Sequence, residues 1–222
     1  MDKKTEVINC ACLIHGTAYS WDYVDKLYNM LTRNLSRPIK LHVYTEHDRQ
    51  VPDHMVKHEL QDLGVSGPKK AWWYKLQLFN SQHYAGPLLY FDLDVVIANQ
   101  LDWIRELNTD YLWTIRDFRY LQKTNFQTIN SSVMLFNVSE FSYVWDQFLK
   151  DGVATTTNRF QGDQDYITKV VDINKRRYFE DRYFESYRWQ CLDGGYDFQY
   201  RKHRALNTGV RIAPETAVVV FH

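Results

Sequence analysis

The sequence of 222 residues has few of the features that define several large classes of protein. Three cysteines are too few for the disulfide framework of a small secreted domain. The 27 basic and 27 acidic residues give a formal net charge of zero, so the chain has no positive excess with which to bind a nucleic-acid backbone. The longest apolar runs, such as 217–221, are far shorter than the roughly 18 to 20 residues needed to cross a bilayer. We therefore expect no nucleic-acid partner and no transmembrane segment.

The N-terminus lacks the pattern of a secretory signal, because the apolar stretch 7–14 is too short and has no small-residue cleavage site after it. Together with the low cysteine content, this predicts a cytoplasmic protein. Cys10 and Cys12 lie one residue apart in that stretch, and no cluster of histidine or cysteine ligands follows them. We expect both thiols to be core residues.

The rest of the composition is that of an ordinary globular protein, with 45% hydrophobic and 24% charged residues. Aromatic residues are frequent, at 16% of the chain. We expect tryptophans in helical or aromatic-rich segments to be core residues more often than platforms for sugars, and four are of this kind: Trp72, Trp73, Trp145 and Trp189. The length suits one domain, and no linker, repeat or low-complexity tract divides the sequence.

Hydrophobic periodicity predicts alternating strands and helices. The predicted strands are 6–14, 40–45, 88–91, 131–137 and 218–221. The predicted helices are 20–35 with Ser20 as N-cap, 72–79 with Lys75 off its apolar face, 139–148, and a short one from 162 to 171. The β-α-β order at the start favours an α/β fold with a mostly parallel central sheet flanked by helices.

Two carboxylates, Asp92 and Asp94, directly follow the predicted strand 88–91. In extended backbone, side chains two residues apart point to the same side, so both can approach one cation. Their hard oxygen atoms suit Mg²⁺ or Mn²⁺, ions that neutralise a departing phosphate. This edge of an open α/β sheet is also where ligands bind. Two aspartates can equally well solvate the end of a strand, so the pair alone does not define a site.

Five short motifs, taken in chain order, strengthen the hypothesis of a metal site. They are Trp72–Leu76, Tyr90–Ile97, Asn130–Asn137, Gly162–Asp165 and Val220–His222. Together they resemble the metal-dependent glycosyltransferases of the GT-A type, above all glycosyltransferase family 8 and its bacterial and viral relatives. The resemblance spans nearly the whole chain. It implies one Rossmann-like domain over 1–222, with nucleotide and metal bound by about 1–100 and donor sugar and acceptor by about 101–222.

The resemblance also implies an activity. The protein would transfer a sugar from a nucleotide-diphosphate donor, first of all a UDP-sugar, to a glycan or other hydroxyl acceptor, with retention at the anomeric carbon. Asp92, Asp94 and His222 would hold Mn²⁺ or Mg²⁺ beside the donor's diphosphate. In relatives, the histidine is followed by a glycine and a Lys-Pro pair that reach the phosphates. This sequence stops at His222, so either it is truncated or that phosphate contact is missing.

Four further residues match positions around the donor sugar in the family. Lys75 would lie near the sugar and the phosphates, where a cation stabilises the charge that grows on the diphosphate. Asn130, Asp163 and Gln164 would surround the sugar with directed hydrogen bonds. A simpler interpretation exists for two of them: Lys75 could be a helix lysine that faces water, and Asp163 could be an ordinary N-cap.

The loop after the first strand, with His15, Gly16 and Thr17, would lie over the nucleotide base, and Tyr19 could stack on it. Two other functions fit parts of the same pattern. A nucleotidyltransferase also uses paired aspartates on such a sheet, although His15–Ala18 is a poor glycine-rich loop. A catalytically degenerate domain that only binds nucleotide or glycan is the second alternative.

Overall fold

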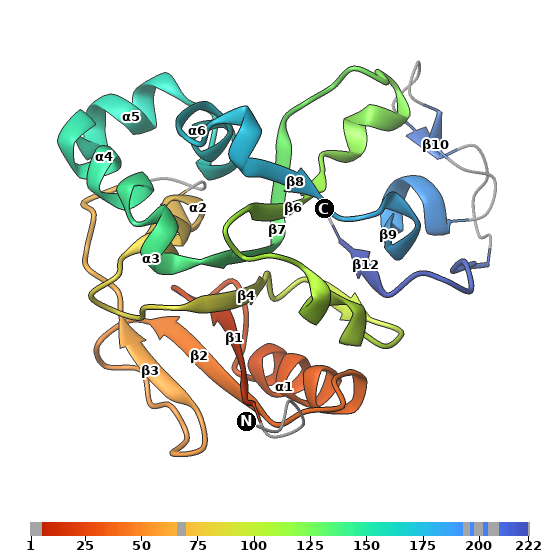
Figure 1. Ribbon diagram of the computed structural model, residues 1–222, viewed down its shortest axis with the longest axis horizontal. Coiled ribbons are helices and arrows are strands. Elements are labelled where there is room, and N and C mark those ends of the chain that lie inside the picture. The colour runs from red at the N-terminus through yellow and green to blue at the C-terminus, as the bar shows by residue number, and fades with distance from the viewer. Residues whose placement is uncertain (1–5, 66–69, 193–195, 198–201, 204–208, 222) are drawn as a thin grey trace.

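The computed structural model describes residues 6–65, 70–192, 196–197, 202–203 and 209–221. Their main element is a seven-stranded sheet in the order β3-β2-β1-β4-β7-β6-β8 (Figure 1). Its strands are β1 (Ile8–Leu13), β2 (Ile39–Thr45), β3 (Val56–Glu59), β4 (Pro87–Phe91), β6 (Leu112–Arg116), β7 (Ile129–Asn137) and β8 (Arg176–Tyr178). Only β7 runs antiparallel to its two neighbours, so the expected mostly parallel α/β sheet is confirmed.

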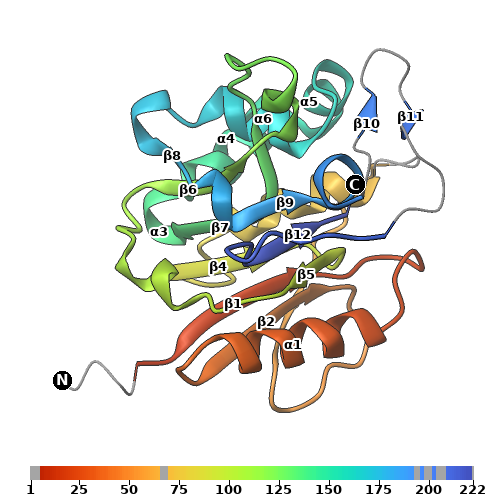
Figure 2. The same ribbon diagram turned by 90° about the vertical axis from the view of Figure 1, so that its right-hand side faces the viewer.

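A second sheet of three short strands lies beside the first, and the sequence did not reveal it. It consists of β5 (Val95–Ile97), β12 (Val218–Val220) and β9 (Phe184–Ser186), in that order. A separate two-stranded pair joins β10 (Tyr196–Asp197) to β11 (Lys202–His203). Figure 2 shows β5 and β12 above helix α1 (Asp22–Asn34), on the same face of the central sheet. The predicted strand near the C-terminus therefore exists, but it belongs to this small sheet.

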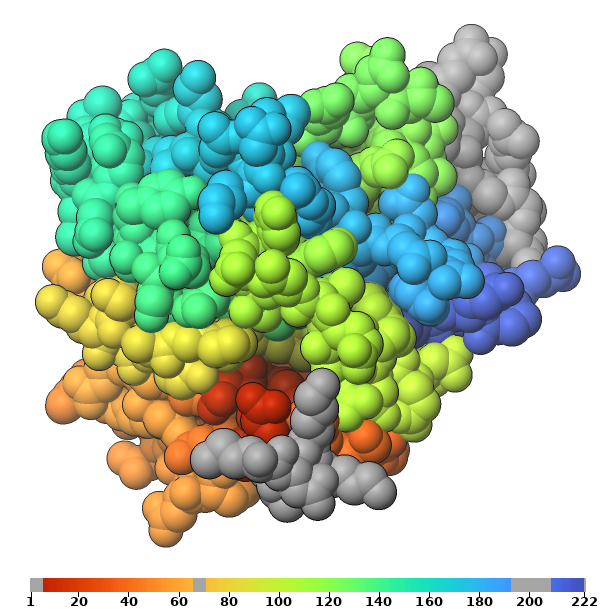
Figure 3. All heavy atoms as spheres, in the orientation of Figure 1, coloured from red at the N-terminus to blue at the C-terminus, as the bar shows by residue number. Residues whose placement is uncertain are grey.

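Helices cover the opposite face of the central sheet. They are α2 (Lys70–Tyr74), which continues as the 3₁₀ helix η1 (Lys75–Phe79), then α3 (Val138–Phe141), α4 (Tyr143–Asp151), α5 (Val153–Arg159) and α6 (Asp163–Val170). Shorter turns of helix are η2 (Asp102–Glu106), η3 (Phe118–Leu121), η4 (Ile173–Lys175), η5 (Asp181–Tyr183) and η6 (Tyr187–Cys191). In the space-filling view of Figure 3, the N-terminal segments in red and orange form the lower part of the surface.

The core is divided by the central sheet, because alternate residues of a strand point to opposite faces. Cys10 and Cys12 of β1 pack on the side of α1, whereas Ala11 packs on the side of η1 and α4. Leu89 and Tyr90 of β4 divide in the same way. Both thiols are fully buried and free, as expected, and burial holds their pKa values far above the usual range.

Three local predictions were wrong. Helix α1 begins one residue later than expected, with Trp21 and not Ser20 at its N-cap and no side-chain cap. The segment 72–79 is not an amphipathic α-helix, because it tightens to a 3₁₀ helix at Lys75 and all five residues of η1 are buried. Trp72, which the sequence predicts to be a core residue, is 47% exposed, whereas Trp73 beside it is 3% exposed. Among the described residues, no helix has the length and apolar character that crossing a membrane requires.

Candidate active site

Two strands of the central sheet end at the same edge, and each is followed by an aspartate. Because β7 is antiparallel to both β4 and β6, those two strands run in the same direction. Asp92 follows β4, and its N–H donates to the Ser132 carbonyl at 2.8 Å as the last bond of the β4–β7 ladder. Asp117 follows β6. Asp94 lies where the chain leaves the central sheet and enters β5, so the two aspartates predicted as metal ligands lie at the junction of the two sheets.

Lys75 is a buried cation surrounded by acidic groups. Its side chain is 10% exposed, and its Nζ lies 2.8 Å from Asp92 Oδ1 and 3.7 Å from Asp163 Oδ2. Burial opposes the charged form of Lys75, but Asp163 and Asp92 outweigh it and raise the pKa of the ammonium above its usual range. The interpretation of Lys75 as a lysine that faces water is therefore wrong.

Ser131 of β7 connects the cation to Asp163. Its hydroxyl lies 3.2 Å from Lys75 Nζ and donates to Asp163 Oδ2 at 2.6 Å. Asp163 is the first residue of α6 and is 4% exposed, while Gly162 occupies the N-cap position. Burial raises the pKa of the Asp163 carboxyl, and Lys75 acts in the opposite direction. Asp163 is therefore a partner of Lys75 and not a capping residue.

Asp94 lies next to this cluster, and its carboxyl is a weaker acid than that of an ordinary aspartate. Burial, and then the negative charge of Asp92, raise its pKa to about 6. Tyr19 donates a side-chain hydrogen bond to it. Two hard carboxylates that repel each other in a partly buried corner fit a divalent cation such as Mn²⁺ or Mg²⁺, whose charge would offset the repulsion.

The described residues contain no group of three or more histidine, cysteine or acidic side chains arranged to hold a metal ion. His222, the third predicted ligand, lies outside the described residues. The residue before it, Phe221, donates its N–H to the Asp94 carbonyl at 3.0 Å. The C-terminal end of β12 therefore passes directly beside Asp94.

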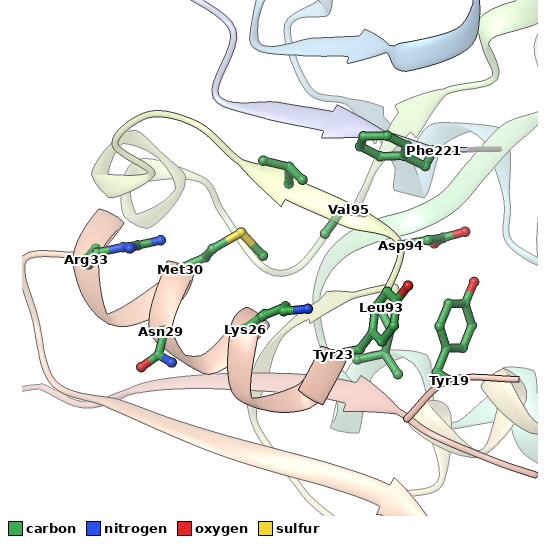
Figure 4. A pocket seen from close by; sticks show the side chains of 11 residues that line it. Tyr19, Tyr23, Lys26, Asn29, Met30, Arg33, Leu93, Asp94, Val95 and Phe221 are labelled. Carbon is green, nitrogen blue, oxygen red and sulfur yellow. The ribbon is translucent and has the colours of Figure 1, made fainter. Parts of the chain in front are cut away.

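A cavity of about 500 Å³ opens beside Asp94, between α1 and β5. Figure 4 shows Tyr19, Tyr23 and Asp94 at one end of it and Arg33 at the other. Its remaining lining residues are Lys26, Asn29, Met30, Leu93, Val95, Val96 and Phe221. This volume falls in the range of small-molecule pockets, and the mixture of aromatic, apolar and a few polar groups is typical of them.

The loop after β1 is held in place by its neighbours. Gly16 has φ of +69°, a conformation that favours glycine. Glu46 accepts a hydrogen bond from the Gly16 N–H, and Arg49 Nη2 donates to the Gly16 carbonyl at 2.7 Å. His15 stacks on Tyr74, with ring centroids 4.2 Å apart. The polar backbone groups of Gly16 are thus already hydrogen-bonded, whereas Thr17 is exposed.

Gln164 and Asn130 lie at the same edge but make different contacts. Gln164 Nε2 donates to Asp117 Oδ2 at 3.2 Å. Asn130 is 9% exposed, and its Oδ1 accepts from the Ser132 N–H at 2.8 Å. The structure therefore brings Lys75, Asp92 and Asp163 into direct contact. Gln164 is hydrogen-bonded to Asp117, which was not predicted as a site residue.

Three residues of this site were not singled out from the sequence. Ser131 and Tyr90 lie inside motifs that were noted, and Tyr90 donates its hydroxyl to Asp92 Oδ1 at 2.5 Å. Asp117 has a weaker signal, because it follows the mostly apolar segment 112–115 after one intervening residue, Arg116, whereas Asp92 follows 88–91 directly. That segment was not predicted as a strand, so the parallel between the two aspartates was not visible.

This arrangement of sheets and helices is the GT-A fold of glycosyltransferases. The galactosyltransferase LgtC, solved with donor and acceptor sugar analogs, matches it with a TM-score of 0.60 at 14% identity, over 96% of this chain and 87% of LgtC. WbbM, a bifunctional glycosyltransferase, matches with a TM-score of 0.61 at 12% identity over 98% of this chain and 46% of WbbM.

The glycosyltransferase GlyE of Streptococcus pneumoniae TIGR4 is also similar, with a TM-score of 0.55 and 14% identity over 80% of this chain and 46% of GlyE. No protein-family model matches the sequence, and no curated protein matches it. At such low identity, the likeness establishes the fold and leaves the activity to be argued from the site.

Proposed function

We propose that the protein is a metal-dependent glycosyltransferase that uses a nucleotide-diphosphate sugar, with UDP-sugars as the first candidates. The observation that carries the proposal is the buried contact of Lys75 with Asp92 and Asp163, next to Asp94, at the strand edge of a GT-A fold. A buried cation held between carboxylates at a ligand-binding edge is costly for stability and is typical of a functional site. The solved LgtC complex with donor and acceptor sugar analogs supports the assignment of two substrates.

In this proposal, the diphosphate of the donor lies at Asp92 and Asp94, and the nucleotide extends toward Tyr19. Asp92 and Asp94 would hold Mn²⁺ or Mg²⁺, which, when bound, neutralises negative charge on the diphosphate. The aromatic lining of the cavity beside Asp94 supports a nucleotide at this end. His222 would be a further metal ligand.

Lys75 acts on the bond that breaks. As the bond between the anomeric carbon and the diphosphate oxygen lengthens, negative charge grows on the phosphate and positive charge grows on the sugar ring. The Lys75 ammonium stabilises the first of these charges. Asp163, with Asn130 and Gln164 nearby, stabilises the second. The oxygen of the acceptor hydroxyl then bonds to the anomeric carbon, and its proton passes to the diphosphate oxygen that departs. The resemblance to family 8 favours attack from the face of the leaving group, which retains the configuration.

The acceptor is a hydroxyl group of a glycan or of another molecule. We propose a cytoplasmic location, which the three free and buried cysteines support, because disulfides are rare in a reducing compartment.

The test is a calorimetric titration of UDP, GDP, CDP and ADP with Mn²⁺, Mg²⁺ or EDTA, followed by assays of UDP release from a panel of UDP-sugars. For wild type, we expect binding of one nucleotide only with metal present. For Asp94→Asn, we expect metal-dependent affinity to fall at least about tenfold, or ~1.4 kcal/mol. The control is Asp146→Asn, an exposed aspartate on α4.

Turnover that needs no metal and survives Asp94→Asn would contradict the proposal. Release of pyrophosphate from a nucleoside triphosphate would indicate a nucleotidyltransferase. Metal-dependent nucleotide binding without turnover on any donor would indicate a binding domain.

A further inference from the structure

One tryptophan of the pair Trp72–Trp73 lies outside the core. Trp73 is 3% exposed and its ring is parallel to that of Phe148, with centroids 6.1 Å apart. Trp72 is 47% exposed, the largest exposed fraction of any described tryptophan. Full burial of a large apolar side chain stabilises a fold. Trp73 therefore contributes to stability through nearly complete burial, whereas Trp72 is only about half buried.

The position of Trp72 relates it to the candidate active site. Trp72 precedes Lys75 by three residues on the continuous helix formed by α2 and η1. Residues three apart on a helix lie on the same side, with Cβ atoms about 5 to 6 Å apart. The indole of Trp72 is therefore on the side of the helix that carries Lys75, whereas Trp73 packs against Phe148 of α4.

A second contact links Trp72 to Asp163. A Cβ atom added to Gly162 would lie 3.1 Å from Cε3 of Trp72, so the indole is packed directly against the backbone of Gly162. The φ of Gly162 is −175°, which any residue can adopt. The close approach of the indole, and not the backbone conformation, is therefore what limits the size of this residue. Gly162 is followed by Asp163, so Trp72 packs against the residue that directly precedes one partner of the buried ion pair.

These contacts place the groups of the site in a definite order. Tyr19 is hydrogen-bonded to Asp94, Asp92 and Asp163 both contact Lys75, and Trp72 packs against Gly162, which precedes Asp163. In the proposed function, the nucleotide occupies the end at Tyr19 and the donor sugar lies at Lys75 and Asp163. A group beyond them is in position to contact the second substrate.

We propose that Trp72 is the platform on which a pyranose ring of the acceptor stacks. The inference rests on the proposed function and deepens it, because it makes the acceptor a sugar. One face of a pyranose is rich in C–H groups, and contact with an indole removes apolar area from water. The hydroxyl groups at the ring edge would meet polar side chains such as Gln164. An aromatic face with a few directed polar groups is the usual form of a small-molecule site.

The test measures binding of the acceptor alone, so it does not depend on turnover. Methyl pyranosides and short oligosaccharides are titrated into the metal-free protein, and saturation-transfer NMR detects which of them bind. We expect at least one pyranoside to bind wild type, Trp72→Ala to weaken it about tenfold or more, and Trp72→Phe to restore most of the affinity. Gly162→Ala, which displaces the indole, should also weaken binding. Tyr143→Ala, which removes another exposed aromatic, on α4, should leave it unchanged.

Equal affinities for wild type and Trp72→Ala, or no saturable binding of any pyranoside by wild type, would overturn the inference. UDP titrations with Mn²⁺ on the same samples test the proposed function separately. We expect them to be unaffected by Trp72→Ala, because Trp72 packs beside Asp163, whereas the nucleotide in the proposed function lies beside Asp94 and Tyr19. Loss of nucleotide affinity in Trp72→Ala would show a general structural role and would also count against the platform.

Discussion

Lys75 shows how a single residue determines the electrostatics of this site. Its ammonium is within 4 Å of Asp92 and Asp163, and all three side chains are mostly or largely buried. Removing two charges from water costs more than the attraction between them regains, unless hydrogen bonds satisfy the remaining polar atoms. Ser131 and Tyr90 supply those hydrogen bonds. The buried charges of this cluster are balanced only while the ammonium of Lys75 is present.

Replacing this cation is therefore predicted to destabilise the fold. In Lys75→Met, the carboxylates of Asp92 and Asp163 stay buried without a counter-charge, and we expect the free energy of unfolding at pH 7 to fall by about 3 to 5 kcal/mol. Urea denaturation measures the change. Lys57→Met is the control, because Lys57 is paired with Glu59 at the surface and such pairs contribute about 0 to 1 kcal/mol.

A second substitution distinguishes loss of charge from loss of packing. The loss of stability in Lys75→Met can come from the unpaired charge of Asp163. In that case, the double variant Lys75→Met/Asp163→Asn should lose less free energy of unfolding than the two single variants lose together. A non-additive recovery of about 1 kcal/mol or more is within the range for groups in direct contact. Strict additivity would mean that the cost arises from packing alone.

At the scale of elements, the loop after β1 is held by the segment that follows β2. Glu46 and Arg49 form an ion pair three residues apart, with Arg49 Nε 3.0 Å from Glu46 Oε2, and together they bind both polar backbone groups of Gly16. The pKa of Glu46 is lowered to about 2, because hydrogen bonds from Arg49 and from the Gly16 N–H outweigh the opposing effect of burial. This pair fixes the conformation of the loop that carries Tyr19.

Loss of Arg49 is predicted to weaken nucleotide binding without altering the chemical step. In Arg49→Met, the Gly16 carbonyl loses its donor and the loop gains freedom, so we expect the KM for the donor to rise about fivefold to twentyfold and kcat to change less than twofold. Steady-state kinetics and UDP titration measure both quantities.

A matched control for this prediction is available. Arg105 and Asp102 form another ion pair three residues apart with similar exposure, and they lie in η2, outside the candidate site. Arg105→Met should leave the KM for the donor unchanged. If both variants behave alike, the effect of Arg49 is one of general stability. A fall in kcat alone would place Arg49 in the chemistry and not in the loop.

The elements that could be predicted from sequence are those with a strong local pattern. The strands 88–91 and 131–137 and helix α1 are clear in the apolar periodicity, and so is the pair of aspartates at the end of β4. The burial of Lys75 could not be predicted, because the change from α-helix to 3₁₀ helix alters which residues share a face. Asp117 was missed for a similar reason, since β6 before it was not detected.

At the scale of the whole molecule, the candidate site depends on both ends of the sequence. The small sheet pairs β5, which directly follows Asp94, with β12 near the C-terminus. Three-residue strands have little periodicity of their own, and their pairing is fixed by contacts between distant segments. The sequence could therefore indicate that 218–221 is a strand but not that it lies against the segment after Asp94. The backbone at Asp94 is therefore held in part by a segment more than 120 residues away in the sequence, through the bond from the Phe221 N–H to the Asp94 carbonyl.

The fold also buries a pair of histidines that the candidate site does not include, and this predicts how stability depends on pH. His42 of β2 and His58 of β3 are 4% and 9% exposed, and His42 Nδ1 lies 2.7 Å from His58 Nε2. Burial, followed by nearby positive groups, lowers the pKa of each to about 4. In the unfolded chain, the same histidines bind protons at about pH 6.5. Their contribution to the free energy of unfolding is therefore fully present above that pH and is lost as the pH drops toward 4.

A pKa lowered by this amount corresponds to a fall of about 3 kcal/mol in the free energy of unfolding between pH 7 and pH 4, for protonation of one histidine of the pair. Carboxylates contribute to the same range, so the comparison must isolate the histidines. In His58→Gln, an amide that does not titrate can still bond to His42, and we expect the fall in unfolding free energy to be smaller by about 2 to 3 kcal/mol. His54→Gln, at an exposed position, should follow wild type. Parallel pH profiles for wild type and His58→Gln would mean that the pair is already protonated in the folded protein, with the cost of its charge met by neighbouring groups.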